Sequence, residues 1–336
     1  MTAMIETHDL SKDFVKKLDF AGKIATHLGA DLHEQVVRAV DRVHLGVEKG
    51  EVVGLVGESG CGKSTLGRMV AGILAPTSGH VFFNGEDYAE LSGPQARRAQ
   101  LAVQMIFQDP YASLNPRHRV ETIVGEAPLV HGLASKSGLA DYVDDILKRV
   151  GLDPECKRRY PHQFSGGQRQ RLGIARALAV KPDFLVCDEA IAALDVSIQA
   201  QVLNLFMDLR EEFDLTYLFI SHDLSVVEHI SDRVVIMYLG RVVEVAPTEV
   251  LFEQPNHPYA AALLAEIPRL DQRKRQFKPI EGEIPSPIHP PSGCHFHPRC
   301  PHAFARCQSE VPALQKIAPG RYAACHLNDE PTPKNE

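Results

Sequence analysis

The sequence has no uninterrupted apolar run approaching the roughly 18 residues that a membrane-spanning helix needs. Its start, Met1 to Glu6, lacks the basic and then apolar segments of a secretory signal peptide. It also has no excess of positive charge, because 36 Lys and Arg against 43 Asp and Glu give a formal net charge of −7. That balance argues against nonspecific nucleic-acid binding as the main activity. These absences predict a protein that is made and kept in the cytosol.

The bulk composition is that of an ordinary globular protein, with 44% hydrophobic and 24% charged residues. A length of 336 residues allows one large domain with an appendage, or two modest domains. The composition shifts near residue 266, because twelve of the 23 prolines lie after that point. Proline at that density does not continue helices or central strands. We therefore predict a separate, loop-rich module over residues 266–336.

The N-terminal region predicts a strand, a glycine-rich loop and a helix in succession. Residues 5–14 and 40–56 have the pattern of strands, whereas residues 15–37 show no clear period and predict an inserted surface excursion. The second strand region ends in an apolar run at Glu51–Val56, and helical spacing follows over residues 64–74. This order is the context that a phosphate-binding loop requires.

The loop itself matches the pattern G-x-x-x-x-G-K-S/T from Gly57 to Ser64. Glycines let successive backbone amides point at phosphates, and the following helix contributes its positive end. Lys63 is expected to reach the β- and γ-phosphates, and the Ser64 hydroxyl to ligate Mg²⁺. The residues predicted to hold ATP here are Gly57, Glu58, Ser59, Gly60, Cys61, Gly62, Lys63, Ser64 and Thr65. Alone, the pattern also fits a glycine turn before a core helix.

A second element supports the nucleotide interpretation. The apolar strand 184–187 is followed by Asp188 and Glu189. A carboxylate at a strand end can hold Mg²⁺, which we assign to Asp188, and strand alternation aims Glu189 elsewhere, as a general base for water. A solvated acidic turn is the alternative. With the apolar strand 216–220, these segments predict a parallel α/β sheet whose site lies along one edge.

A third element, Phe164 to Arg171, is another polar, glycine-rich helix start, and so a second anion-binding end. It resembles the LSGGQ signature of the ATP-binding cassette (ABC) family, with Phe164 in the first position. The resemblance implies a head-to-tail dimer in which Ser165, Gly166, Gly167 and Gln168 of one subunit cover the γ-phosphate bound by the other. It implies an α/β P-loop NTPase fold over residues 1–265, with a RecA-like core, an antiparallel β subdomain and a helical subdomain at about 110–180. It also implies an ATPase.

The remaining positions of the family occur in order. By the resemblance, Gln108 senses the γ-phosphate and Mg²⁺, Asp195 lies in the loop that crosses the dimer interface, and His222 contacts the γ-phosphate. Phe14 matches the aromatic residue that stacks on adenine. The catalytic set is then Lys63, Gln108, Glu189 and His222. One departure is that Ala190-Ile191-Ala192 follows Glu189, where the family usually has Pro-Thr-Ser or a similar run.

A narrower resemblance, to the ATPase subunits of bacterial oligopeptide/dipeptide importers, rests on residues 111–117, 195–201 and 254–259. It implies a peripheral protein on the cytoplasmic face of the inner membrane that powers peptide uptake. Its partners would be a second, related ATPase subunit, two membrane permeases contacted by the stretch after Gln108, and indirectly an extracytoplasmic peptide-binding protein. Nickel chelates or glutathione are alternative cargoes. A soluble cassette ATPase acting on ribosomes or DNA, or an exporter subunit, are alternative functions, although this chain lacks the second cassette, coiled coil or fused membrane helices usual in those proteins.

The tail concentrates four of the seven cysteines in the last 43 residues, which in a reducing compartment indicates a metal more than disulfides. The spacing of Cys294, Cys300, Cys307 and Cys325 matches neither zinc ribbons nor ferredoxins, yet four thiolates can bind a 4Fe–4S cluster or Zn²⁺. The importer resemblance favours the iron–sulfur cluster, with Zn²⁺ and free thiols as alternatives. Nearby histidines keep mixed ligation open.

Overall fold

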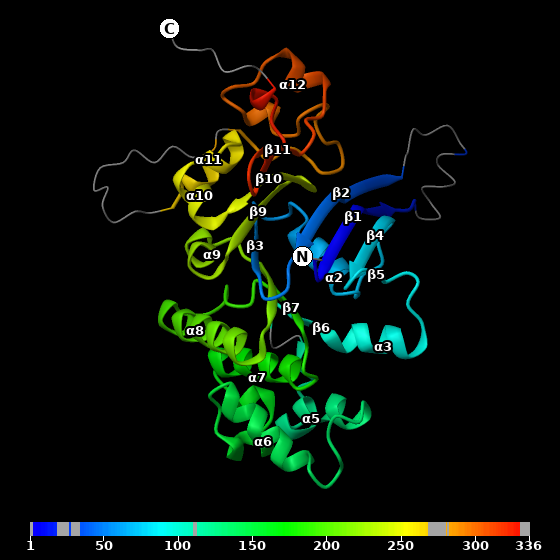
Figure 1. Cartoon of the computed structure of the whole chain (residues 1–336), viewed down its shortest axis with the longest axis vertical. Coiled ribbons are helices and arrows are strands. Elements are labelled where there is room, and N and C mark those ends of the chain that lie inside the picture. Colours follow the sequence, from blue (N-terminus) through cyan, green and yellow to red (C-terminus); the bar gives the residue numbers. More distant parts are fainter. Residues whose placement is uncertain are drawn as a thin grey trace.

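The computed structural model describes residues 3–18, 27, 34–109, 113–267, 280 and 282–329. The molecule is elongated, with a large sheet at its centre, an antiparallel sheet beside it, a helical layer at one end and the C-terminal module at the other (Figure 1). The strands are β1 Ile5–Lys16, β2 Gln35–Val47, β3 Val52–Val56, β4 Ser78–Phe83, β5 Glu86–Asp87, β6 Val103–Ile106, β7 Phe184–Asp188, β8 Thr216–Ile220, β9 Arg233–Tyr238, β10 Arg241–Pro247, β11 Gln315–Ala318 and β12 Arg321–Ala323. The α-helices are α2 Lys63–Val70, α3 Gly93–Ala102, α5 Val120–Val130, α6 Leu139–Arg149, α7 Gly166–Leu178, α8 Val196–Phe213, α9 Leu224–Ile230, α10 Thr248–Glu253, α11 Pro258–Leu264 and α12 Ala305–Ser309.

The large sheet has the strand order β11-β12-β10-β9-β3-β8-β7-β6 within the described residues. Its central strands β9, β3, β8, β7 and β6 are parallel. Strands β3, β7 and β8 are buried along their whole length, which explains their unbroken apolar runs. Parallel strands end at one common edge, so the residues after β3, β6, β7 and β8 meet there. The predicted α/β class is confirmed.

The smaller sheet is antiparallel and includes part of the expected excursion at 15–37. Strand β1 continues to Lys16 and pairs there with Gln35 of β2. The prediction ended the first strand too early and began the second too late. Phe14, Val15 and Lys16 are all exposed and carry no alternating apolar face. Residues 19–26 and 28–33 of the excursion lie outside the described part of the chain.

Helices α5, α6 and α7 lie together at one end of the molecule (Figure 1), within the predicted helical subdomain. Their apolar faces form one core with the edge of the large sheet, and Phe164 is buried in it. In the described parts of the chain, no helix combines the length and apolarity needed to span a bilayer.

The C-terminal module extends the large sheet. Strand β12 pairs antiparallel with β10, and β11 pairs with β12. Phe296 is fully buried against the rings of Tyr238 and Tyr259. The module is therefore packed on the cassette through both backbone and aromatic contacts.

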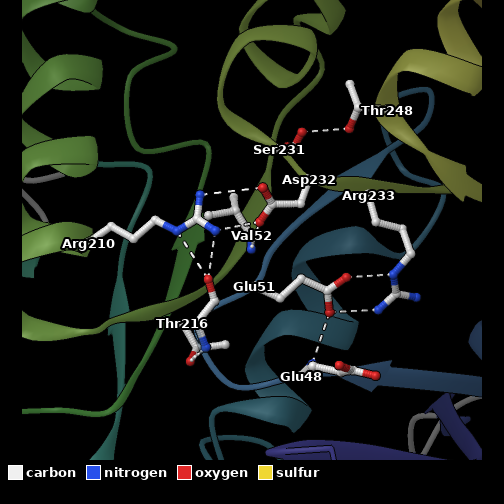
Figure 2. A network of polar contacts seen from close by, with 10 residues as sticks. Glu48, Glu51, Val52, Arg210, Thr216, Ser231, Asp232, Arg233 and Thr248 are labelled. Atoms are coloured by element: carbon white, nitrogen blue, oxygen red, sulfur yellow. Dashed lines mark hydrogen bonds and ion pairs between the residues drawn. The ribbon is translucent and has the colours of Figure 1, made fainter. Parts of the chain in front are cut away.

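An ion-pair network ties together the amino ends of the central strands, opposite the edge where the phosphate loop lies (Figure 2). Arg210 of α8 donates to the Gly50 carbonyl at 2.7 Å and to Asp232 at 2.6 Å. Asp232 accepts the Val52 amide at 2.8 Å. These bonds join α8 to the start of β3 and to the residue before β9, so they fix the amino ends of these two strands relative to each other.

Candidate functional site

The loop after β3 requires its glycines. Gly57, Gly60 and Gly62 all have positive φ, at 154°, 79° and 107°. A Cβ at Gly57 would lie 2.2 Å from the carbonyl oxygen of Met237, and one at Gly62 would lie 2.1 Å from that of Ala39. The turn is thus both conformationally restricted and closely enclosed by neighbouring backbone.

Lys63 begins helix α2 and lies inside the loop, with 5% of its surface exposed. Its ammonium donates to the carbonyls of Gly57 at 2.7 Å and Glu58 at 3.1 Å. A buried ammonium at a helix start makes the loop electropositive, which suits an anionic ligand.

Ser64 and Asp188 bring two oxygen donors together. The Ser64 hydroxyl donates to Asp188 Oδ1 at 2.8 Å, although the residues are 124 positions apart. Asp188 is 2% exposed, and burial raises the pKa of its carboxyl while the Ser64 hydrogen bond opposes the shift. A hydroxyl and a carboxylate beside a phosphate loop suit Mg²⁺, which would neutralise negative charge on the phosphate oxygens.

Glu189 lies between two other predicted residues. Its carboxylate accepts the Gln108 amide at 2.5 Å, and His222 Nδ1 lies 3.3 Å from its other oxygen. These side chains come from the ends of β6, β7 and β8, as the parallel sheet dictates. Glu189 has a φ of 47°, a left-handed conformation that non-glycine residues adopt at a cost of about 1–3 kcal/mol, often at functional sites.

The Ala190-Ile191-Ala192 departure keeps this turn firmly packed. Ala190 and Ile191 are buried in the core shared with the helical subdomain. The Ile191 carbonyl accepts the Gln199 side chain at 3.1 Å. The loop after Glu189 is therefore held by buried apolar side chains rather than by a proline.

The signature segment forms the exposed start of α7. Ser165 caps the helix by accepting the Gln168 amide, and the Gln168 side chain accepts the Ser165 amide at 3.1 Å. A Cβ at Gly167 would lie 2.5 Å from the Ile198 side chain, so this glycine lets α8 approach. Asp195, just before α8, is exposed.

Phe14 lies on the exposed end of β1, with 44% of its surface accessible and Lys12 Nζ 5.6 Å from its ring centre. An exposed ring is available for stacking, and its role with adenine stays a prediction. Tyr111 and Ala112, in the predicted permease-contacting stretch, lie outside the described residues.

Two residues that hold the loop were missed from the sequence. Tyr259 accepts the Glu58 amide at 2.9 Å, and Arg299 pairs with the Glu58 carboxylate. Both are more than 200 positions away in the chain, and no local pattern links them to the loop.

The predicted metal cluster in the tail is not supported. The described residues, which include Cys294, Cys300, Cys307 and Cys325, contain no group of three or more His, Cys, Asp or Glu side chains arranged to hold a metal ion. Burial, and after it the charge of the neighbouring thiolates, raises the pKa values of Cys294, Cys300 and Cys325, that of Cys325 to about 11. The described residues therefore give no support for a 4Fe–4S cluster or for Zn²⁺, and spacing in the chain does not by itself establish a metal-binding geometry.

Comparison with known proteins identifies relatives among the ATP-binding proteins of ABC transporters. The ABC transporter family matches residues 40–192, and the oligopeptide/dipeptide transporter C-terminal region matches residues 243–307. A probable peptide ABC transporter ATP-binding protein, y4tS of Sinorhizobium fredii, is 52% identical over 87% of this chain and 83% of its own length. The oligopeptide transport ATP-binding protein AppF of Bacillus subtilis is 50% identical over 87% of this chain and 90% of its own.

Solved structures share the fold. The ATP-binding cassette MJ0796 bound to ADP and Pi, described as a dimer after hydrolysis, is 25% identical with a TM-score of 0.60, covering 73% of this chain and 99% of its own. The cbiO1 protein of Clostridium perfringens, part of an ABC transporter complex, has a TM-score of 0.61 at 25% identity, covering 76% of this chain and 92% of its own. The chain thus belongs to the ATP-hydrolysing, ATP-binding proteins of ABC transporters, in the group with the oligopeptide/dipeptide transporter C-terminal region.

Proposed function

We propose that this chain is the ATP-hydrolysing subunit of an importer that takes up di- or oligopeptides. The observation that carries the proposal is the likeness, at 50–52% identity through cassette and tail, to proteins named for peptide or oligopeptide transport. The match of residues 243–307 to the oligopeptide/dipeptide transporter C-terminal region supports it further.

In the proposed reaction, a water molecule attacks the γ-phosphorus in line with the bond to the β-γ bridging oxygen. That bond breaks, the bridging oxygen leaves as part of ADP, and the γ-phosphoryl group becomes inorganic phosphate. Glu189 accepts the proton of this water, and its hydrogen bond from Gln108 and its proximity to His222 orient it. Lys63 and the helix start stabilise charge on the phosphate oxygens. Ser64 and Asp188 would hold the Mg²⁺ that neutralises those oxygens.

We further propose that two cassettes act together. Ser165 and Gln168 lie exposed at the start of α7, where their helix end is available to a second molecule's nucleotide. Val196, beside Asp195, is an apolar side chain with 82% of its surface exposed, which fits an interface. The dimeric MJ0796 cassette, which shares the fold, supports this arrangement. A related paralogue and a second copy are both compatible partners.

Membrane permeases would anchor the chain to the cytoplasmic face of the membrane, with an extracytoplasmic peptide-binding protein delivering cargo. Affinity purification of the tagged chain from gently solubilised membranes tests this assembly. Two permease subunits are the expected partners, whereas recovery of ribosomes or DNA in their place would support a soluble cassette ATPase. Uptake of labelled tripeptides, nickel and glutathione, each measured with and without Glu189→Gln, then identifies the cargo.

A further inference from the structure

Arg299 lies in the cysteine-bearing tail yet reaches the phosphate loop. It ends a short 3₁₀ turn at His297–Arg299, directly before Cys300, and only 4% of its side chain is exposed. Its guanidinium donates to both oxygens of Glu58, at 2.8 and 2.9 Å. The rings of Tyr238 and Phe296 lie 5.8 and 6.0 Å from its central carbon. The bidentate ion pair and the packing against two aromatic rings fix the orientation of the guanidinium.

Glu58 is held a second time through its backbone. Its amide donates to the Tyr259 hydroxyl at 2.9 Å, and Tyr259 is fully buried in α11. The Glu58 carbonyl, in turn, accepts Lys63 Nζ at 3.1 Å. The side chain, the amide and the carbonyl of Glu58 therefore each have a hydrogen-bond partner. Through its carbonyl, Glu58 connects Arg299 of the tail to Lys63, the lysine predicted to reach ATP.

The ion pair between Glu58 and Arg299 also compensates a negative charge in the phosphate loop. Glu58 places a carboxylate in a loop whose ligand is a polyanion, and like charges at short range repel. With its carboxylate bound to Arg299, Glu58 is neutralised and cannot turn toward Lys63. Without the guanidinium, the carboxylate would repel the phosphates or compete with them for the ammonium.

We infer that Arg299 is a positioning residue for ATP, through which the C-terminal module sets the nucleotide affinity of the phosphate loop. Its action is indirect, through Glu58 and Lys63. The inference rests on ATP binding by the loop and is independent of the cargo proposed above.

Binding of mant-ATP with Mg²⁺ to the full-length chain, followed by fluorescence, tests this role. Arg299→Met should weaken binding by at least about tenfold, because two like charges about 12 Å apart at an effective dielectric of about 20 already repel by about 1.4 kcal/mol. Adding Glu58→Gln to that variant should restore most of the affinity, because the unpaired carboxylate is then gone. A merely structural role for Arg299 predicts no such restoration. Arg306→Ala is the matched control and should leave the affinity unchanged, since it removes ion pairs with Glu310 and Asp329 elsewhere in the module.

Arg299→Lys is a second variant in case Arg299→Met does not fold. Lysine keeps the positive charge but cannot form the bidentate pair with Glu58, so mant-ATP binding should weaken by about threefold, or ~0.6 kcal/mol. Circular dichroism establishes that each variant is folded. Wild-type affinity in a folded Arg299→Met or Arg299→Lys variant, or a double variant as weak as Arg299→Met alone, would overturn the inference.

Discussion

Alanine at two glycines of the phosphate loop separates backbone strain from steric exclusion. Gly60 and Gly62 both have positive φ, at 79° and 107°. A Cβ at Gly60 would meet no atom within 4 Å, whereas one at Gly62 would lie 2.1 Å from the Ala39 carbonyl oxygen. That oxygen belongs to β2, so it cannot give way as a flexible side chain would.

The magnitudes follow from these two environments. Gly60→Ala adds only the strain of a left-handed conformation, about 1–2 kcal/mol. Gly62→Ala adds comparable strain and the displacement of a strand, for which overpacking of about 1–3 kcal/mol is typical. The total for Gly62→Ala is then about 2–5 kcal/mol, which corresponds to at least a roughly thirtyfold effect on an equilibrium constant.

The loss can appear in folding, in ATP binding, or in both. Urea denaturation gives the loss in unfolding free energy, and mant-ATP titration gives the loss in binding free energy. We expect the sum of these two losses to be larger for Gly62→Ala than for Gly60→Ala. Circular dichroism checks that both variants keep their helices. Equal losses for the two variants, or a larger loss for Gly60→Ala, would refute the argument that close backbone approach demands glycine at residue 62.

Three further predictions concern the base, the strand-end network and a buried histidine. Glu189→Gln should retain ATP binding but slow hydrolysis by about two to four orders of magnitude, measured as phosphate release, because the proton acceptor is lost. Arg210→Met should lower the unfolding free energy by about 1–3 kcal/mol, because the half-exposed Asp232 loses its cation and the Gly50 carbonyl loses its donor. Lys49→Ala, which removes an exposed ion pair with Asp214, should leave the unfolding free energy unchanged in the same urea titration. Burial lowers the pKa of His257 to about 4, so the unfolded state binds more protons below about pH 6.5 and stability is lost between that pH and 4, by about 3 kcal/mol at most. His257→Asn should show a shallower fall of melting temperature between pH 7 and 5.

Each of these has an outcome that contradicts it. Near-normal turnover of Glu189→Gln would remove that residue from the role of base. An unfolding free energy of Arg210→Met equal to that of the wild type would mean that the network in Figure 2 does not stabilise the strand ends. Parallel pH profiles for wild type and His257→Asn would show that His257 is not buried in its neutral form.

The parts of the site that lie close together in the chain could be predicted from the sequence. The phosphate loop, the acidic strand end and the signature helix are local patterns, because a strand, a turn and a helix start are built from neighbouring residues. The meeting of Glu189 and His222 was implied as well, since each follows a strand expected to be parallel. The strand before Gln108, β6, was not predicted. What the sequence did not carry was the conformation of Glu189, whose positive φ no residue type there announces.

The tertiary structure decided the features that depend on distant partners. Strand β1 extends past Phe14 because β2 pairs with it, not because its residues alternate. The metal site predicted at the four tail cysteines finds no support in the described residues, because spacing in the chain does not determine where side chains converge. Glu58 and Arg299 meet across 241 positions. By itself, then, the sequence determined an ATP-binding loop and its family, since backbone geometry is local. Only packing could bring the tail onto that loop, since the contact exists solely in the folded chain.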